Sequence, residues 1–221
     1  DPLLRDSFSR LAYGARVSLL VAFFATTISI VVGAAVGLTS GYAEGTRAAS
    51  VDTFLMRMVD VGLSFPYLLL VMAIGAAVGD TTIVTILMVL GFTSWFGTAR
   101  IIRAKTIQVR HLDFIMASRA LGQSTASILL RHILPNVAGP LIVIASASVA
   151  QMIIAESVLS YLQVGLPPPT ATWGRMLLEG QRFYTVAPRL VLAPGILIFL
   201  AVLGFNLVGE DLRDALDPHE D

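Results

Sequence analysis

Five stretches of this chain run for roughly 19 residues or more without a charged side chain, enough for a helix to cross the ~30 Å hydrocarbon core of a bilayer. In lipid, an isolated strand would leave its backbone N–H and C=O groups unpaired, so each stretch is expected to be helical. The sequence therefore predicts an all-α integral membrane protein with five core transmembrane helices, which are Val17–Thr39, Val61–Gly79, Thr81–Ala99, Val137–Ala155 and Leu190–Gly209.

The composition points to the bilayer as the solvent of this chain. Of its 221 residues, 56% are hydrophobic and 14% are charged, and the mean hydropathy is +0.80. A soluble domain of ordinary composition is less apolar. The formal net charge is zero, so nothing points to a nucleic-acid partner. The chain has no cysteine, which excludes disulfides and cysteine-ligated metals.

No residue pattern indicates catalysis or cofactor binding. The chain has no glycine-rich phosphate loop, and His111, His132 and His219 lack the spacing of metal ligands. We therefore expect no enzyme activity, no cofactor and no metal site. One membrane domain, residues 1–221, accounts for the whole sequence. Because the chain begins at Asp1 rather than at a methionine, we also expect it to be part of a longer gene product.

Basic residues between the third and fourth predicted helices set the expected orientation. Positively charged loops tend to stay in the cytoplasm, so this segment is expected to face inward. Residues 1–16, the Gly79–Asp80 turn and residues 156–189 would then lie outside, and residues 40–60 and the C-terminal tail inside. The basic residues in question are Arg100, Arg103, Lys105, Arg110, Arg119 and Arg131.

The polar segment from Leu112 to Pro135 has the pattern of two short helices. Gly122 is expected to stop the first helix, Ser124 to cap the second, and Pro135 to end it before the chain returns to the membrane. Two such helices, each on the order of 15 Å long, make a knob that fits a groove on a partner. The alternative is an amphipathic pair that lies on the lipid headgroups.

Within this segment, Ala117, Ala120, Leu121 and Gly122 form an Ala-x-x-Ala-Leu-Gly block, and a Leu-Pro pair begins twelve positions after the glycine. This spacing resembles the cytoplasmic EAA loop of ATP-binding-cassette (ABC) import permeases. Four more blocks, in the same order, resemble the C-type permease subunit of dipeptide, oligopeptide and nickel ABC importers. They are RDSFSRLAYGARVSLL, VDTFLMRMVDVGLSFP, AESVLSYLQVGLPPPTATWGRML and FNLVGEDLRDALDP.

This resemblance implies a multi-pass permease subunit of the bacterial cytoplasmic membrane without catalytic chemistry of its own. Its partners would be membrane lipid, a second permease subunit of similar fold, two cytoplasmic ATPases and an extracytoplasmic substrate-binding protein. The solute would be a peptide, or alternatively a nickel chelate, glutathione or another peptide-like molecule. Relatives carry one more helix ahead of the conserved core, and this sixth helix is expected outside the chain.

The resemblance also implies that the loop, about residues 103–135, docks on the ATPase. Met116 occupies the position of the glutamate that gives the EAA motif its name, so the contact is expected to depend more on packing. Gln163 and Ala171 also depart from the glycine and proline common at their positions. The implied ATPase-coupling residues are Met116, Ala117, Ser118, Arg119, Ala120, Leu121, Gly122, Leu134 and Pro135.

Two polar residues near the outer end of the fourth predicted helix are candidates for the translocation path or its gate. Glu156 follows an apolar run, and Gln151 precedes it by about one and a half turns. A carboxylate at bilayer depth is costly unless it faces protein or water. The alternative is a headgroup-level Glu156 paired with Arg175 or Arg182. On the second helix, Asp60 and Arg57 suggest a structural ion pair.

Two other functional classes remain open for a membrane protein of this kind. A self-sufficient channel or secondary transporter would show midplane charges, internal repeats or a filter-like segment, and the five uncharged stretches contain no charge cluster. A membrane scaffold without a transport role is the other. Partner ATPases would favour the import permease, and their absence would favour the other two.

Overall fold

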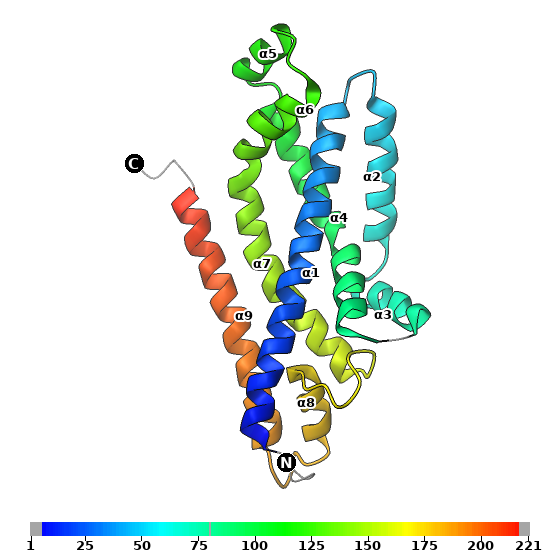
Figure 1. The fold of residues 1–221 in the computed structure, drawn as a ribbon, viewed down its shortest axis with the longest axis vertical. Coiled ribbons are helices and arrows are strands. Elements are labelled where there is room, and N and C mark those ends of the chain that lie inside the picture. The colour runs from blue at the N-terminus through cyan, green and yellow to red at the C-terminus, as the bar shows by residue number, and fades with distance from the viewer. Residues whose placement is uncertain (1–5, 80, 217–221) are drawn as a thin grey trace.

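The computed structural model describes residues 6–79 and 81–216, and within them every regular element is helical. Figure 1 shows an elongated bundle whose long helices α1 (Ser7–Ala43), α4 (Ile83–Val109), α7 (Leu134–Tyr161) and α9 (Arg189–Leu216) follow the long axis. Each of these helices is long and apolar enough to cross a membrane. They confirm four of the five predicted spans and extend beyond the uncharged stretches.

The fifth predicted span is helical but broken. Instead of one helix over Val61–Gly79, the chain forms α2 (Ala49–Ser64) and α3 (Tyr67–Val78), which together qualify as a span bent by 94°. Pro66 is the physical reason, since it cannot donate a backbone hydrogen bond and forces the residue before it out of the helical region. Phe65 accordingly has φ −93° and ψ 139°.

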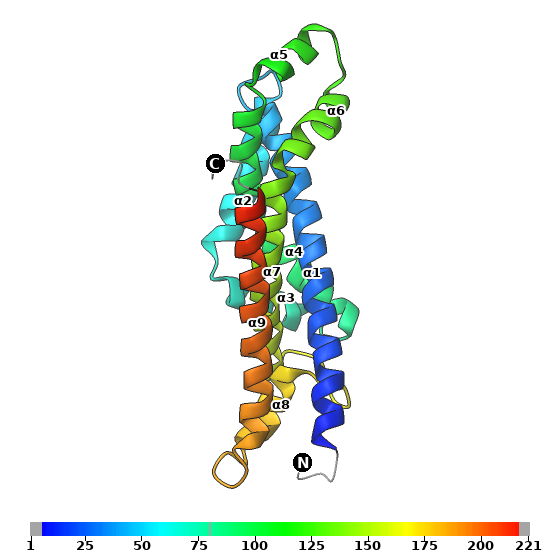
Figure 2. The same ribbon diagram turned by 90° about the vertical axis from the view of Figure 1, so that its left-hand side faces the viewer.

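The predicted loop helices are present. Helix α5 (Asp113–Ala120) ends one residue before Leu121, and Gly122 follows with φ +78°. Helix α6 (Thr125–Ile128) is capped by Ser124, whose hydroxyl accepts a hydrogen bond from the Ser127 amide at 3.3 Å. Both terminators thus act as the sequence predicts. The two helices protrude from one end of the bundle, called here the loop end (Figure 2).

The predicted helix end at Pro135 is wrong. A π-helical turn, Leu129–Ile133, leads directly into α7, and Pro135 stands at the start of that helix. Pro135 cannot donate a backbone hydrogen bond to the preceding turn, yet the helical run continues through it. The side chain of Asn136, expected to begin the return to the membrane, donates to the His132 carbonyl at 2.7 Å within this continuous helical run.

The opposite end, called here the α8 end, carries a helix that the sequence did not predict. Helix α8 (Trp173–Gln181) follows the proline-rich segment and is capped by the Thr172 hydroxyl, which accepts from the Arg175 amide at 3.2 Å. His219 and Asp80, on which sequence expectations also rest, lie outside the described residues.

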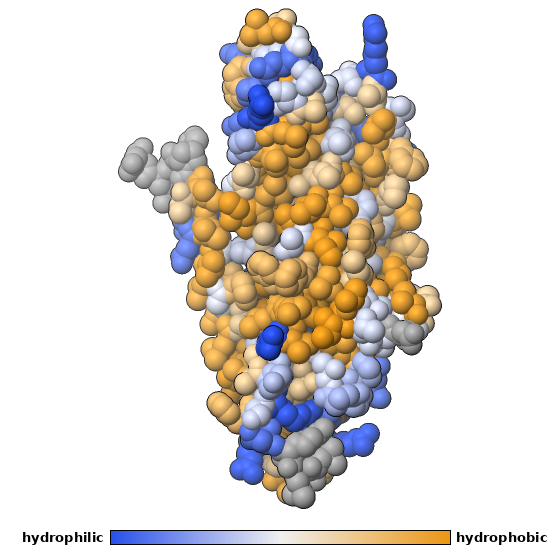
Figure 3. Space-filling view, viewed as in Figure 1, coloured by the Kyte–Doolittle hydropathy of each residue, from blue (hydrophilic) through white to orange (hydrophobic). Residues whose placement is uncertain are grey.

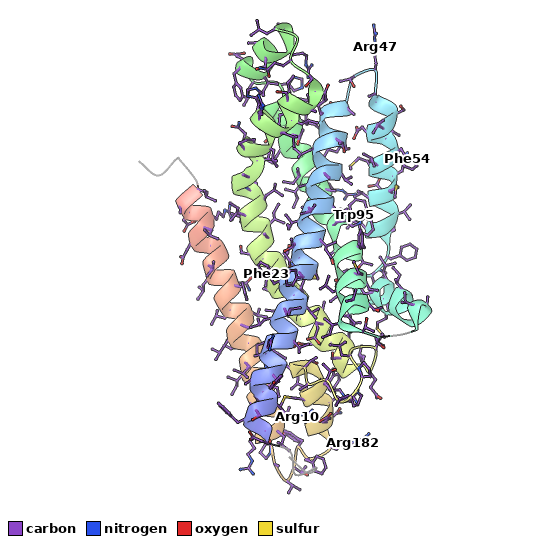
Figure 4. All side chains as sticks on the ribbon, viewed as in Figure 1. Arg10, Phe23, Arg47, Phe54, Trp95 and Arg182 are labelled. Atoms are coloured by element: carbon purple, nitrogen blue, oxygen red, sulfur yellow. The ribbon has the colours of Figure 1, made fainter. Side chains whose placement is uncertain are left out.

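The surface has the polarity of a membrane-spanning bundle. Figure 3 shows apolar residues over most of the middle of one face and hydrophilic residues gathered toward the two ends. Large apolar side chains such as Phe23 and Phe199 are more than half exposed. Trp95, by contrast, is buried where α1, α2 and α4 meet, with Val59 and Ala99 (Figure 4).

Helix α1 packs directly on the backbone of α4 through three glycines spaced four residues apart. A Cβ atom at Gly33 would lie 2.7 Å from the Thr98 Cβ. At Gly37 it would lie 2.7 Å from the Ala99 carbonyl oxygen, and at Gly41 it would lie 2.6 Å from the Arg103 carbonyl oxygen. Small residues at such spacing let two membrane helices approach closely.

We predict that Gly37→Val destabilises the protein by about 1–3 kcal/mol, because its side chain has no room against α4. Gly204→Val is the matched control, since a Cβ at Gly204 meets no atom within 4 Å. Thermal unfolding of the assembled transporter in detergent measures the difference. Equal unfolding midpoints for the two variants would contradict the close α1–α4 contact.

Candidate functional site

The protruding loop exposes large apolar side chains on a polar part of the molecule. Leu121 is 83% exposed, Leu130 62% and Met116 51%. The same loop is anchored from below by Ile115, Ile128 and other isoleucines, which are buried against α4 and α7. An anchored loop that keeps apolar side chains in solvent has the character of a partner-binding surface.

Several contacts hold the loop in one shape. The His132 ring lies 3.0 Å from the Gln123 side-chain oxygen and packs edge-on against Phe114. The Arg119 guanidinium lies 5.1 Å from the centre of the Tyr42 ring, which ties α5 to the end of α1. Sequence reasoning assigned no such role to His132, whose spacing carries no signal for it.

The structure places the remaining predicted coupling residues in two groups. Ala117, Ala120 and Gly122 are exposed near the tip, while the Ser118 hydroxyl donates to the Phe114 carbonyl at 2.8 Å. Leu134 is half-buried and Pro135 is exposed at the start of α7. The block from Met116 to Gly122 therefore forms one continuous surface, whereas the Leu-Pro pair belongs to the base of the loop.

At this base, Arg110 binds the end of α1. Its guanidinium donates to the Gly41 and Tyr42 carbonyls, at 3.1 Å each, and to the Glu44 carbonyl. It also pairs with the Glu44 carboxylate at 2.7 Å. The last carbonyls of a helix have no hydrogen-bond donor within that helix, and the Arg110 guanidinium supplies the missing donors. Sequence reasoning used Arg110 only to orient the chain.

A second arginine joins three helices at the same end. Arg103 of α4 binds the Asp52 carboxylate of α2 with two hydrogen bonds of 2.6 and 2.7 Å. The Ser40 hydroxyl of α1 donates to the same carboxylate. Two-point pairing of arginine with a carboxylate restricts orientation as well as distance. Together, Arg110 and Arg103 connect the base of the loop to both α1 and α2.

Glu156 is fully buried between α1, α7 and α8. Its carboxylate accepts hydrogen bonds from the Ser18 hydroxyl at 2.8 Å and the Ser160 hydroxyl at 2.7 Å. The Trp173 amide donates to the same Ser18 oxygen at 3.3 Å. The residue therefore takes hydroxyl partners, whereas Arg175, one of its expected partners, lies 3.5 Å from Glu179.

Gln151 has the opposite environment. It is exposed and borders a cavity of about 200 Å³ between α4, α7 and the break that separates α2 from α3. Other polar side chains of this cavity are Tyr67, Thr93, Ser94 and Ser148, and the Ser94 hydroxyl donates to the Tyr67 hydroxyl at 2.9 Å. The structure thus does not bring Gln151 and Glu156 together.

Asp60 pairs with Arg100 of α4, and not with Arg57 as the sequence suggested. Arg100 lies on a neighbouring helix, and sequence spacing alone cannot show such a contact. Within residues 6–79 and 81–216, no three His, Asp or Glu side chains are grouped as a metal site requires.

Two relatives have names that state a permease and its solute. The chain is 39% identical to the dipeptide transport system permease protein DppC of Alkalihalophilus pseudofirmus, over 99% of this chain and 70% of the relative. It is 37% identical to the glutathione transport system permease protein GsiD of Pectobacterium atrosepticum, over 99% of this chain and 71% of the relative.

Solved structures share the fold. An inward-facing conformation of the MetNI methionine ABC transporter matches with a TM-score of 0.77 at 16% identity, over 98% of this chain and 99% of the other. An amino acid ABC transporter determined with histidines matches with a TM-score of 0.66 at 17% identity, over 95% of each chain. The family model for binding-protein-dependent transport system inner membrane components matches residues 33–220, and this chain belongs to that family of ABC importer permeases.

Proposed function

We propose that this chain is the permease subunit of an importer that carries peptides across the cytoplasmic membrane and is driven by separate ATPases. Glutathione or another peptide-like solute is the alternative, since relatives with both kinds of name are similar over the whole chain. The observation that carries the ATPase coupling is the exposed apolar surface of the anchored loop, with Leu121 at its tip.

In this proposal the loop end faces the cytoplasm and the loop fills a groove on an ATPase. Met116, Leu121 and Leu130 supply apolar contact, and the small residues Ala117 and Ala120 let the two backbones approach. Closure of the ATPases would move the loop. Arg110 and Arg103 would then pass that movement to α1 and α2, because they bind those helices directly.

The proposal also requires partners beyond the ATPases. A second permease subunit of similar fold would complete the solute path, and a substrate-binding protein would dock at the α8 end. Gln151 would lie in the path, and Glu156 would belong to the outer gate. In the present conformation the buried Glu156 would hold that gate together through Ser18 and Ser160.

The complete complex, reconstituted in liposomes with its binding protein, is expected to import radiolabelled dialanine only when ATP is supplied. This chain alone is expected to import none, because it would then lack both the ATPases and its companion subunit. Uptake assays with and without each partner measure the dependence. Efficient uptake by this chain alone would identify a self-sufficient transporter instead.

We predict that Leu121→Asp uncouples transport from ATP hydrolysis. The new carboxylate would have to be desolvated in an apolar contact, which costs several kcal/mol. ATPase activity of the complex should therefore lose most of its response to solute-loaded binding protein. Ala48→Asp places the same charge on the exposed turn between α1 and α2, and that variant should keep its response. Normal coupling in Leu121→Asp would refute the assigned docking surface.

A single cysteine in place of Glu156 tests the gate, because the natural chain has no cysteine. Glu156 is buried here, so the thiol should react slowly with a water-soluble reagent added from the α8 end. Nucleotide-driven opening should raise its rate. Val186→Cys, at a position 85% exposed, should react in every state. A thiol at position 156 that stays unreactive throughout, with normal uptake by Glu156→Gln, would leave Glu156 a purely structural role.

A further inference from the structure

An exposed ion pair joins α2 to α4 at the border of their uncharged stretches. Asp60 of α2 and Arg100 of α4 are paired, and their side chains are 51% and 55% exposed. At 1.5 Å per residue, Asp60 lies about 16 Å from the start of α2 and Arg100 about 14 Å from the end of α4. Both residues belong to segments apolar enough to span a membrane.

The apolar surface continues on both sides of this pair. On α2, Phe54 and Met58 precede Asp60, Val61 follows it, and all three are exposed. On α4, Phe92 and Ile101 are exposed as well. The pair stands at the border of the uncharged stretches, with Val61 directly after Asp60 and Ala99 directly before Arg100. Charges at the border of a membrane-spanning segment are kept where they meet water or a polar partner.

The cavity beside Gln151 is lined by residues within one helical turn of this ion pair. By helical register, Arg100 shares a face of α4 with Phe96 and Gly97, which line the cavity. On α2, Leu63 also lines the cavity and lies three residues, or one helical turn, after Asp60. Its volume of about 200 Å³ corresponds to roughly seven waters at ~30 Å³ each. We therefore treat the two charges and the cavity as one strip along α2 and α4, called here the strip.

The chemistry of this strip matches a zwitterionic solute with amide groups. Asp60 presents a carboxylate for an amino group, and Arg100 presents a fork of donors for a carboxylate. The Gln151 amide and the hydroxyls of Tyr67 and Ser94 bind peptide groups in either direction. Apolar walls come from Leu63, Phe65 and Phe96. Because these walls make no directional hydrogen bonds, they would accept peptides with varied side chains.

We propose that the strip formed by the Asp60–Arg100 ion pair and the adjoining cavity lines the solute path, and that the pair binds the charged ends of a peptide-like solute in transit. This inference rests on the proposed function and names the residues that would recognise the solute. When no solute is present, the two charges neutralise each other.

The test uses the assembled transporter without nucleotide, carrying single cysteines at Leu63 or Ser148 in the cavity wall. A charged, water-soluble thiol reagent should label both, and a high concentration of dialanine should slow that labelling several-fold. N-acetyl-dialanine amide, which lacks both charges, should not slow the labelling. Phe199→Cys on α9, at an apolar position 63% exposed, should stay unlabelled.

Charge removal tests the role of the pair itself. In the same cysteine backgrounds, Arg100→Gln should weaken the protection by dialanine on the order of tenfold or more, since one charge-assisted contact is lost. Arg182→Gln removes an exposed arginine beyond the end of α8 and should leave the protection intact. Asp60→Asn should likewise weaken the protection by dialanine, and Asp60→Glu should largely keep it.

Two results would overturn the inference: cavity thiols that never react, which would place the strip against lipid or protein, or labelling that dialanine does not slow. Import by the complete complex is measured separately. If the complex imports dialanine but the cavity thiols never react, this inference is refuted and the proposed function stands. Protection by dialanine without import under any condition would refute the proposed function and leave the binding strip in place.

Discussion

The close approach of α1 to α4 is the contact on which the rest of the structure depends. Between apolar helices in a bilayer, burial from water gives little driving force, so association relies on packing and polar contacts. Gly33, Gly37 and Gly41 remove the side chains that would keep the two backbones apart. This pair forms the framework against which α2 and α7 are placed, and it brings Arg103 and Arg110 within reach of α1 and α2.

Polar contacts then fix the two ends of this framework in different ways. At the loop end, arginines bind a carboxylate and the free carbonyls of α1, and these contacts sit beside the base of the protruding loop. At the α8 end, Glu156 accepts from two buried hydroxyls and has no exposed surface. Hydrogen bonds between buried polar groups hold the helices in one arrangement, because breaking such a bond leaves a buried donor or acceptor without a partner.

Much of the fold and part of the site were predictable from local sequence. Uncharged length predicts the spans, a glycine with a capping serine predicts the loop helices, and ordered motifs predict the family. The break at Pro66 was missed because hydropathy does not register the backbone geometry of the residue before a proline. The same local view wrongly ended a helix at Pro135, where a π-helical turn places the proline in the first turn of α7.

The sequence by itself determined which segments enter the membrane, where the first loop helix stops and the second begins, and the family of the chain, because each depends on neighbouring residues or on an ordered pattern. Only the tertiary structure decided which charges meet. Asp60 pairs with a residue 40 positions away, and Arg110 binds carbonyls more than 60 positions away. It also decided that Gln151 is exposed and Glu156 buried, because the packing of neighbouring helices sets which face of α7 is covered.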